Sequence, residues 1–366
     1  MNAIDYFDNL EDPRSDKSKI YSLKDIVFLT ISAVVAGADS YVEIANYGKI
    51  NREWLSKYVN FPKGKSPSHD AINDFYCRLN TEKFKECFIN WTSEVCGITQ
   101  GELISIDGKC LRGSYDKHDK KSAIYMVSAW AGKNEMVLAQ RKVEEKSNEI
   151  TAIPKLLDIL ELKGAIVSID AMGCQKSIAE KIIEEKADYI LALKKNQSSL
   201  YEEVESRFKN IKSKKVDITI EKSHGRIEER KCEVIENMEF IDEAKKWKGL
   251  KTIIKISTKR TEVITSKTSE EQRYYISSTR KDAKEFNKLI RGHWAIENKL
   301  HWVLDVQFNE DKSRVRKGNG DENFAIIRHI ALNLLKLLDR PKMSMKVKRK
   351  NAGWSNHFLQ EVLNIS

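Results

Sequence analysis

Two apolar segments, each closed by an aspartate, constrain the fold of this chain more than any other feature. The segment ELISIDGKC (102–110) carries Asp107, and GAIVSIDAMG (164–173) carries Asp170. Both are predicted to be buried strands that end on the acid, where a carboxylate is costly unless water, a partner or a metal stabilises it. Neighbouring strands that end in this way bring their acids together at the edge of an open sheet, where ligands bind.

Each aspartate taken alone is best explained as a cap for the turn or helix that follows it. As a matched pair with no base nearby, Asp107 and Asp170 instead favour a hard divalent cation, because the cation offsets the repulsion between two negative charges. We therefore expect the pair to hold a metal ion.

Strands and helices alternate through the middle of the chain. Strand-like runs occupy 102–110, 122–132, 135–143, 164–173 and 187–196, and helical periodicity occupies 149–162 and 175–186. This order predicts an α/β fold with a mixed sheet covered by helices on both faces. Polar and apolar residues then alternate within 197–280, which predicts antiparallel strands inserted into this domain. Two helices are expected to follow, at about 283–304 and 322–338.

At 366 residues the chain is too long for one ordinary core. The changes in helical and strand pattern along the sequence predict three parts. Residues 1–98 are predicted to be a helical N-terminal domain. Its helix capped by Ser68 is compatible with a DNA-binding helix-turn-helix, although the pattern alone favours a plain bundle. Residues 99–340 form the predicted α/β domain with its β-rich insertion at about 197–280. Residues 341–366 are predicted to be a basic, mobile tail.

The charge of the chain points to a partner rather than to a fold. There are 64 Lys and Arg against 54 Asp and Glu, a net charge of +10, and residues 312–350 alone hold 12 basic and three acidic side chains. We expect an anionic partner such as DNA to bind there. No signal segment, no bilayer-length apolar run and no C-x-x-C pair occurs, which predicts a soluble, cytoplasmic protein with no membrane partner.

A second group of polar residues lies in RGHWAIENKLHWVLD (291–305). His293, Glu297, His301 and Asp305 are spaced by four, so they follow one face of a helix. The spacing does not match the H-E-x-x-H pattern of a zinc helix, so the carboxylates are the better candidates for a third metal ligand. A polar helix face with no ligand is an equally simple explanation.

Asp107, Asp170 and Glu297 together have the order of acids found in ribonuclease-H-like nucleases and DDE transposases. The chain resembles bacterial insertion-sequence transposases of the DDE type, most closely the H-repeat-associated, ISAs-type family. The resemblance covers nearly the whole chain and is carried by DPRSDKSKIYSLKDI (12–26), KSPSHDAINDF (65–75), SIDGKCLRGS (105–114), VSIDAMGCQKSIAEKI (167–182), ADYILALKKNQ (187–197), SHGRIEER (223–230) and RGHWAIENKLHWVLDVQFNEDKSRVRKGNGDEN (291–323).

The resemblance implies a ribonuclease-H-like catalytic domain in which Asp107, Asp170 and Glu297 are both catalytic and metal-binding. It implies cleavage at the ends of a mobile element, followed by attack of the freed 3′-hydroxyl on target DNA, with two Mg²⁺ or Mn²⁺ ions. The implied partners are double-stranded DNA and a second copy of the chain in a synaptic homodimer. The residues expected to contact DNA are Lys109, Arg112, Lys194, Lys195, His293, Asn298, His301, Arg314 and Arg316.

One family feature is absent. Related transposases with a β insertion carry Tyr, Arg and Lys at −7, −4 and +6 from the glutamate, where this chain has Ile290, His293 and Val303. Asp305 and Asp311 are therefore kept as alternatives to Glu297. Trp294 and Trp302 are candidates for stacking on an unpaired base, although core packing explains them more simply.

Two other functions are compatible with the same residues. One is a ribonuclease-H-like nuclease that cuts without strand transfer, and the other is a catalytically silent copy that only binds DNA. An assay with pre-cleaved ends separates transposase from nuclease, and inverted repeats flanking the gene would favour a mobile element.

Overall fold

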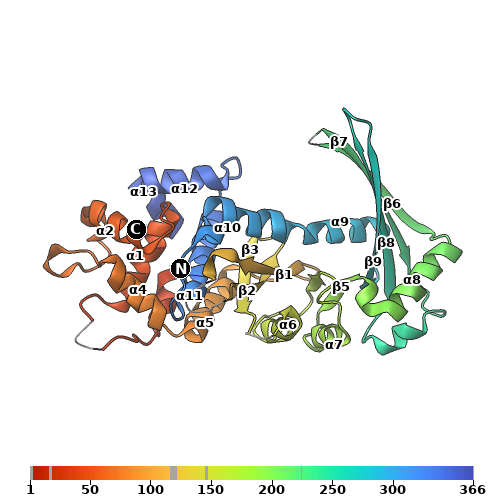
Figure 1. Ribbon diagram of the computed structural model, residues 1–366, viewed down its shortest axis with the longest axis horizontal. Helices are drawn as coiled ribbons and strands as arrows, with labels where there is room; N and C mark the ends of the chain where they lie inside the picture. The colour runs from red at the N-terminus through yellow and green to blue at the C-terminus, as the bar shows by residue number, and fades with distance from the viewer. Residues whose placement is uncertain (1–2, 16–18, 116–121, 145–146, 224, 366) are drawn as a thin grey trace.

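A single nine-stranded mixed sheet runs through the middle of the protein and out of one side (Figure 1). The computed structural model describes residues 3–15, 19–115, 122–144, 147–223 and 225–365. The strands are β1 Leu103–Leu111, β2 Ile124–Ala131, β3 Met136–Lys142, β4 Ile166–Ile169, β5 Asp188–Leu193, β6 Lys215–Ser223, β7 Arg226–Ile235, β8 Thr252–Glu262 and β9 Thr268–Ser277. Their order across the sheet is β3-β2-β1-β4-β5-β9-β8-β7-β6.

The first five strands confirm the predicted mixed sheet. β1, β4 and β5 are parallel. β2 lies between β1 and β3 and is antiparallel to both, so β3 runs in the same direction as β1. Helices α6 Glu149–Leu157 and α7 Lys176–Glu184 cover one face, and α9 Ala283–His293 crosses the other (Figure 1). Side chains alternate along each strand, so Ile104 and Ile106 pack toward α6 and α7 while Leu103 packs toward α9.

The predicted β-rich insertion is antiparallel and continues the main sheet rather than folding apart from it. β9 pairs with β5, so β9, β8, β7 and β6 extend the sheet by four strands. Helix α8 Ser198–Asn210 packs on their lower part, and the hairpins project well beyond it (Figure 1). α9 then leads the chain back along the sheet to the body of the protein.

The N-terminal segment is helical in its described part. Its helices are η1 Ala3–Phe7, α1 Leu23–Val35, α2 Tyr41–Ile50, α3 Arg52–Leu55, η3 Pro62–Gly64, α4 His69–Arg78 and α5 Thr81–Val95. Ser68 caps α4 as expected, its hydroxyl accepting from the N–H of Ala71 at 3.2 Å. These helices share one apolar core with α11 Gly320–Leu337, which packs against α1, α4 and α5. The first 98 residues therefore have no core of their own.

The last residues differ from the predicted mobile tail. Residues 345–363 form helices α12 Met345–Trp354 and α13 Asn356–Leu363, whose Leu359, Val362 and Leu363 are buried in the core shared with the N-terminal helices. The high basic content hid this docking, because one of its cations, Arg349, points inward. Arg349 lies over the ring of Phe308 and donates to Asp39 at 2.6 Å and to the carbonyl oxygens of Val34, Ala38 and Gln307.

No helix in the described ranges is long and apolar enough to cross a membrane. All six cysteines are free.

We predict that Arg349→Met lowers the free energy of unfolding by about 3 kcal/mol, because it leaves Asp39 and three carbonyl groups without a buried donor. Lys346→Met on the exposed side of the same helix is the control and changes stability by less than about 0.5 kcal/mol. Urea unfolding measures both. Equal stability of the two variants would mean that α12 does not dock as described.

Candidate active site

The parallel register of β1 and β4 brings the two predicted aspartates together. Ile106 lies opposite Ile169, so the next residues along the two strands are Asp107 and Asp170. Both project toward the face on which α9 lies, as do Ser105 and Ser168, whose hydroxyls are 3.2 Å apart beneath them. The prediction that the acids lie side by side on neighbouring strands is confirmed.

The prediction that the first strand ends at Asp107 is wrong. β1 continues to Leu111 because β2 pairs with it along its whole length, with Asp107 opposite Ser128. Asp170, in contrast, directly follows the last residue of β4. Its Oδ1 accepts from the N–H groups of Met172 at 3.0 Å and Gly173 at 3.3 Å, so it also caps the following turn.

The third predicted acid, Glu297, lies where the long helix changes its winding. The expected helix at 283–304 is α9 up to His293, a π-helical turn Glu297–His301, and α10 Trp302–Gln307. π-turns within α-helices are frequent at functional sites. Glu297 is exposed on this turn, and Trp302 is 56 % exposed, so core packing does not explain that tryptophan.

The pKa of Asp107 responds to both of the other predicted acids. Burial, and then the negative charges of Asp170 and Glu297, raise the pKa of Asp107 to about 7. No group of three or more His, Cys, Asp or Glu in the described ranges is already arranged to hold a metal ion. The donor chemistry nevertheless fits a hard divalent cation, because a cation would relieve the repulsion that raises this pKa.

A fourth carboxylate, that of Glu149, lies beside the site and was missed from the sequence. Glu149 begins α6, and its Oε1 is 2.5 Å from the place that a Cβ on Gly108 would occupy. Burial and then the charge of Asp170 raise its pKa. The glycine after Asp107 is the available signal, because a Cβ there would crowd this carboxylate where it now lies.

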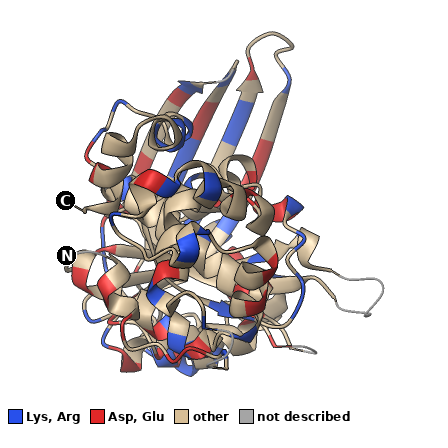
Figure 2. Cartoon of the chain, turned by 90° about the vertical axis from the view of Figure 1, so that its left-hand side faces the viewer, with Lys and Arg blue, Asp and Glu red and all other residues tan. Residues whose placement is uncertain are grey.

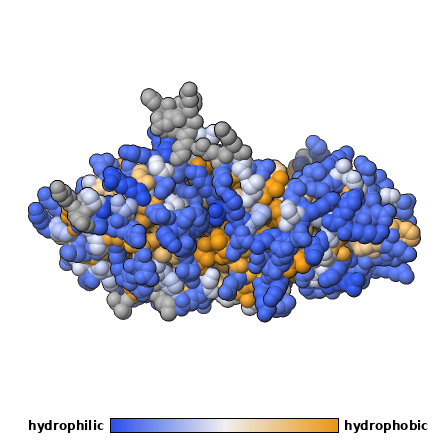
Figure 3. Space-filling model, turned by 90° about the horizontal axis from the view of Figure 1, so that it is seen from below, coloured by the Kyte–Doolittle hydropathy of each residue, from blue (hydrophilic) through white to orange (hydrophobic). Residues whose placement is uncertain are grey.

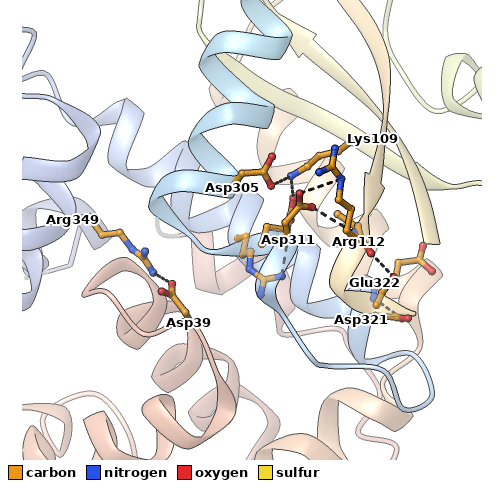
Figure 4. A network of polar contacts seen from close by, with 12 residues as sticks. Asp39, Lys109, Arg112, Asp305, Asp311, Asp321, Glu322 and Arg349 are labelled. Carbon is orange, nitrogen blue, oxygen red and sulfur yellow. Dashed lines mark hydrogen bonds and ion pairs between the residues drawn. The ribbon is translucent and has the colours of Figure 1, made fainter. Parts of the chain in front are cut away.

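Lys109, one of the predicted DNA contacts, lies in a buried ion cluster (Figure 4). Its Nζ is 2.5 Å from Asp305 Oδ1 and 2.6 Å from Glu310 Oε2, and its side chain is 11 % exposed. Glu310, 2 % exposed, also lies 4.0 Å from Arg328 of α11. This cluster fastens β1 to the helices that follow Glu297.

The two alternatives to Glu297 are engaged elsewhere. Asp305 binds Lys109, and Asp311 lies 3.7 Å from Arg112 and accepts weakly from its backbone N–H (Figure 4). The backbones of the two segments also approach closely at Gly113, where a Cβ would be 2.3 Å from the carbonyl oxygen of Ser313. Glu297 is thus the candidate whose carboxylate is most accessible to a metal.

Two of the predicted DNA contacts are histidines that lie under the acids. His293 Nδ1 is 2.9 Å from Ser168 Oγ, and burial lowers its pKa to about 4. His301 Nδ1 is 3.5 Å from Asp107 Oδ2, and burial and the nearby Lys109 lower its pKa to about 4 as well. Both rings are neutral near pH 7, so they support the acids and do not offer charge to a phosphate.

The other predicted contacts lie on or near the surface. Arg112, Lys194, Lys195, Asn298 and Arg314 are exposed, and Arg316 is half-buried. Arg316 lies over Tyr115 and donates to the carbonyl of Gly113 at 3.1 Å. Residues 312–317 line a cavity of about 900 Å³ together with the first turns of α2 and α4.

A cavity of about 420 Å³ opens beside Asp170 and Glu297 and is lined on its far side by β9. Lys194 lines it, as does Arg273, whose guanidinium lies 5.0 Å from the ring centre of Trp294. Arg273 was missed from the sequence, because only the pairing of β9 with β5 carries the insertion to the site. The insertion therefore contributes directly to the surroundings of the acids.

Residues 98–334 match the family described as Transposase DDE domain, and residues 4–92 match the one described as DDE_Tnp_1-associated. The chain belongs to the DDE transposase family.

Two relatives illustrate how far this family likeness extends. A putative transposase YncI of Escherichia coli O157:H7 is 45 % identical over 99 % of this chain and 94 % of its own length. The H repeat-associated putative transposase YhhI of E. coli K12 is 42 % identical over 94 % of this chain and 92 % of its own. The predicted resemblance is confirmed, although residues 16–18 and 224, within two of its segments, lie outside the described ranges.

Among solved structures, a piggyBac transposase synaptic complex with hairpin DNA aligns with 98 % of this chain and 76 % of its own. The TM-score is 0.47 at 12 % identity, a likeness too distant to define the fold.

We predict that Lys109→Met lowers the free energy of unfolding by about 3–5 kcal/mol, because it leaves Asp305 and the buried Glu310 without their cation. Arg112→Met is the matched control: its side chain is 81 % exposed, and the change should be below about 0.5 kcal/mol. If Lys109→Met is as stable as the wild type but binds DNA less tightly, Lys109 is a DNA contact as first expected.

Proposed function

We propose that this chain is an active transposase that cuts DNA at the ends of its element and joins the freed 3′ ends to target DNA. The observation that supports this proposal is the position of Asp107 beside Asp170 on paired strands, where burial and the charges of Asp170 and Glu297 raise the pKa of Asp107 to about 7. Three acids that repel one another serve no purpose in stability, whereas they suit a site that binds divalent cations during catalysis.

In this proposal Asp107, Asp170 and Glu297 hold two Mg²⁺ or Mn²⁺ ions. When bound, such ions lower the pKa of the attacking water or 3′-hydroxyl and neutralise the leaving oxygen. The protein itself positions the DNA strand. Lys194 lines the cavity beside Asp170 and Glu297, and Lys195 and Arg112 are exposed cations; we assign all three to binding phosphates. His293 and Ser168 keep β4 and α9 together, so that Asp170 and Glu297 stay on the same side of the sheet.

The fold supports a ribonuclease-H-like catalytic unit formed by β1 to β5 with α6 and α7, followed by the β insertion. We assign double-stranded DNA as the substrate and a homodimer as the unit that holds two element ends in the cytoplasm. The N-terminal helices, with α4 next to the basic residues 312–317, are assigned to recognition of the element end.

We predict that Asp107→Asn, Asp170→Asn and Glu297→Gln each reduce cleavage of a labelled element end at least ~100-fold. Binding of the uncut end should change by less than about threefold. The carboxylates and the DNA phosphates are both negative, so removing a carboxylate charge removes no attraction to the DNA. Gel-based cleavage and fluorescence anisotropy on the same preparations separate the two effects.

Asp311→Asn is the control for these variants, since Asp311 is held by Arg112 and should not bind metal. A Glu297→Gln protein that cuts normally, together with an inactive Asp311→Asn protein, would move the third ligand to Asp311. Strand transfer from pre-cleaved ends distinguishes the transposase from a nuclease, which would cut but never join.

We further predict that Lys312→Glu, Arg314→Glu and Lys317→Glu together weaken DNA binding and make its salt dependence shallower. Each lost phosphate contact should reduce the slope of log K against log salt by about 0.9. Glu11→Lys, an exposed change at the N-terminal end, should leave both the affinity and the slope unchanged. An unchanged slope in the triple variant would exclude residues 312–317 from the DNA interface.

A further inference from the structure

The two edges of the nine-stranded sheet differ in whether other elements cover them. At one edge, the side-chain amide of Asn333 accepts from the N–H of Val137 at 3.0 Å and donates to its carbonyl oxygen at 2.8 Å. Thr92 donates to the next carbonyl, that of Leu138, at 2.8 Å. Helices α5 and α11 thus cover β3. At the other edge, β6 has a neighbour on one side only among the described strands.

The uncovered strand β6 is long and apolar on one face. Val216, Ile218 and Ile220 are 43 %, 53 % and 67 % exposed, and they lie on the same face because they are two residues apart. Edge strands of monomeric proteins are normally short, charged or broken by proline, because a long apolar edge pairs with another strand. No proline interrupts residues 216–220, and their one charged residue, Asp217, lies on the opposite face from the apolar row and accepts from Asn287.

The strand is also held in a fixed position, as a pairing surface must be. On its opposite face, Asn287 of α9 donates to Asp217 at 2.7 Å, and Arg291 forms an ion pair with Glu221. Along its inner edge, β6 pairs with β7 from Lys215 to Ser223. Little conformational freedom is therefore lost when a further strand adds to this edge.

We propose that two copies of this chain associate through β6, antiparallel and about a twofold axis at Ile218. In this register Ile218 lies opposite Ile218 of the second copy, and Val216 lies opposite Ile220. The three apolar residues of each strand then meet only apolar partners, which is the arrangement that stabilises cross-strand pairs.

The charged residues select this register over its neighbours. With the axis at Ile218, Lys215 lies opposite Glu221, and Asp217 lies opposite Thr219. With the axis one residue further, at Thr219, Asp217 would lie opposite Glu221 and Val216 opposite Lys222. Like charges directly opposite are destabilising, and apolar residues gain nothing opposite a lysine. Figure 2 shows acids and bases interleaved on the projecting strands, where no uniform charge would keep two copies apart.

Two sheets joined in this way form one continuous sheet with a covered β3 edge at each end. The face seen from below in Figure 3, opposite the projecting hairpins, is mostly hydrophilic outside its middle. This interface goes beyond the proposed chemistry, and the two proposals can fail separately. A chain that pairs through β6 but does not cut DNA would contradict only the proposed chemistry. A monomer that cuts DNA would contradict only the interface.

Cysteine cross-linking tests the register directly. Directly opposed residues of an antiparallel pair are close enough for a disulfide. Under mild oxidation, Ile218→Cys should therefore form a covalent dimer by itself. Val216→Cys and Ile220→Cys should each remain monomeric alone but cross-link when the two variants are mixed. The wild-type chain, with its six native cysteines, is the background control.

Ile218→Lys tests the association itself. It should raise the dimer dissociation constant by more than ~10-fold in sedimentation equilibrium, because two lysines would meet at the axis. Ile264→Lys, at a 94 % exposed position in the turn between β8 and β9, is the control and should leave the dimer intact. Circular dichroism confirms that each variant is folded. A wild-type chain that is monomeric at all concentrations, or a dimer that survives Ile218→Lys, overturns the proposal, and a dimer without the Ile218→Cys cross-link overturns the register.

Discussion

The parallel pairing of β1 with β4 is the constraint on which the rest of the structure depends. Once Ile106 is opposite Ile169, Asp107 and Asp170 must lie next to each other on one face of the sheet. Burial, and then repulsion from Asp170 and Glu297, raise the pKa of Asp107 to about 7. The structure tolerates this cost because strong apolar packing of both strands on α6, α7 and α9 fixes the register.

The surroundings of the acids are arranged to hold the helix that carries Glu297 against the sheet. Lys109 joins β1 to Asp305 and Glu310, and Ser168 joins β4 to His293. Lys109 lies two residues beyond Asp107 and Ser168 two residues before Asp170, on the same strands and the same face. Farther away, α11 packs against β3 and joins the first and last helices of the chain in one core. Changes in that core are thereby expected to act on the position of the acids as well as on stability.

The sequence was a good guide where periodicity and local chemistry decide the outcome. The alternation of strands and helices predicted the mixed sheet, and two apolar strands with aspartates predicted the adjacent acids. It was a poor guide where long-range pairing decides. β2 extends β1 past Asp107, and β5 recruits β9 and so brings Arg273 to the site. Lys109 and Arg349 look like surface cations in the sequence, and only the folded chain reveals the buried acids Glu310 and Asp39 beside them.

The most direct test of the central claim is a crystal structure of the protein with bound element-end DNA and Mn²⁺, using anomalous scattering to locate the metal. The account predicts manganese peaks between the carboxylates of Asp107, Asp170 and Glu297, and their loss in the Glu297→Gln variant. Peaks at Asp305 or Asp311, or an Asp107–Asp170 pair that binds no metal while the protein still cuts DNA, would contradict it.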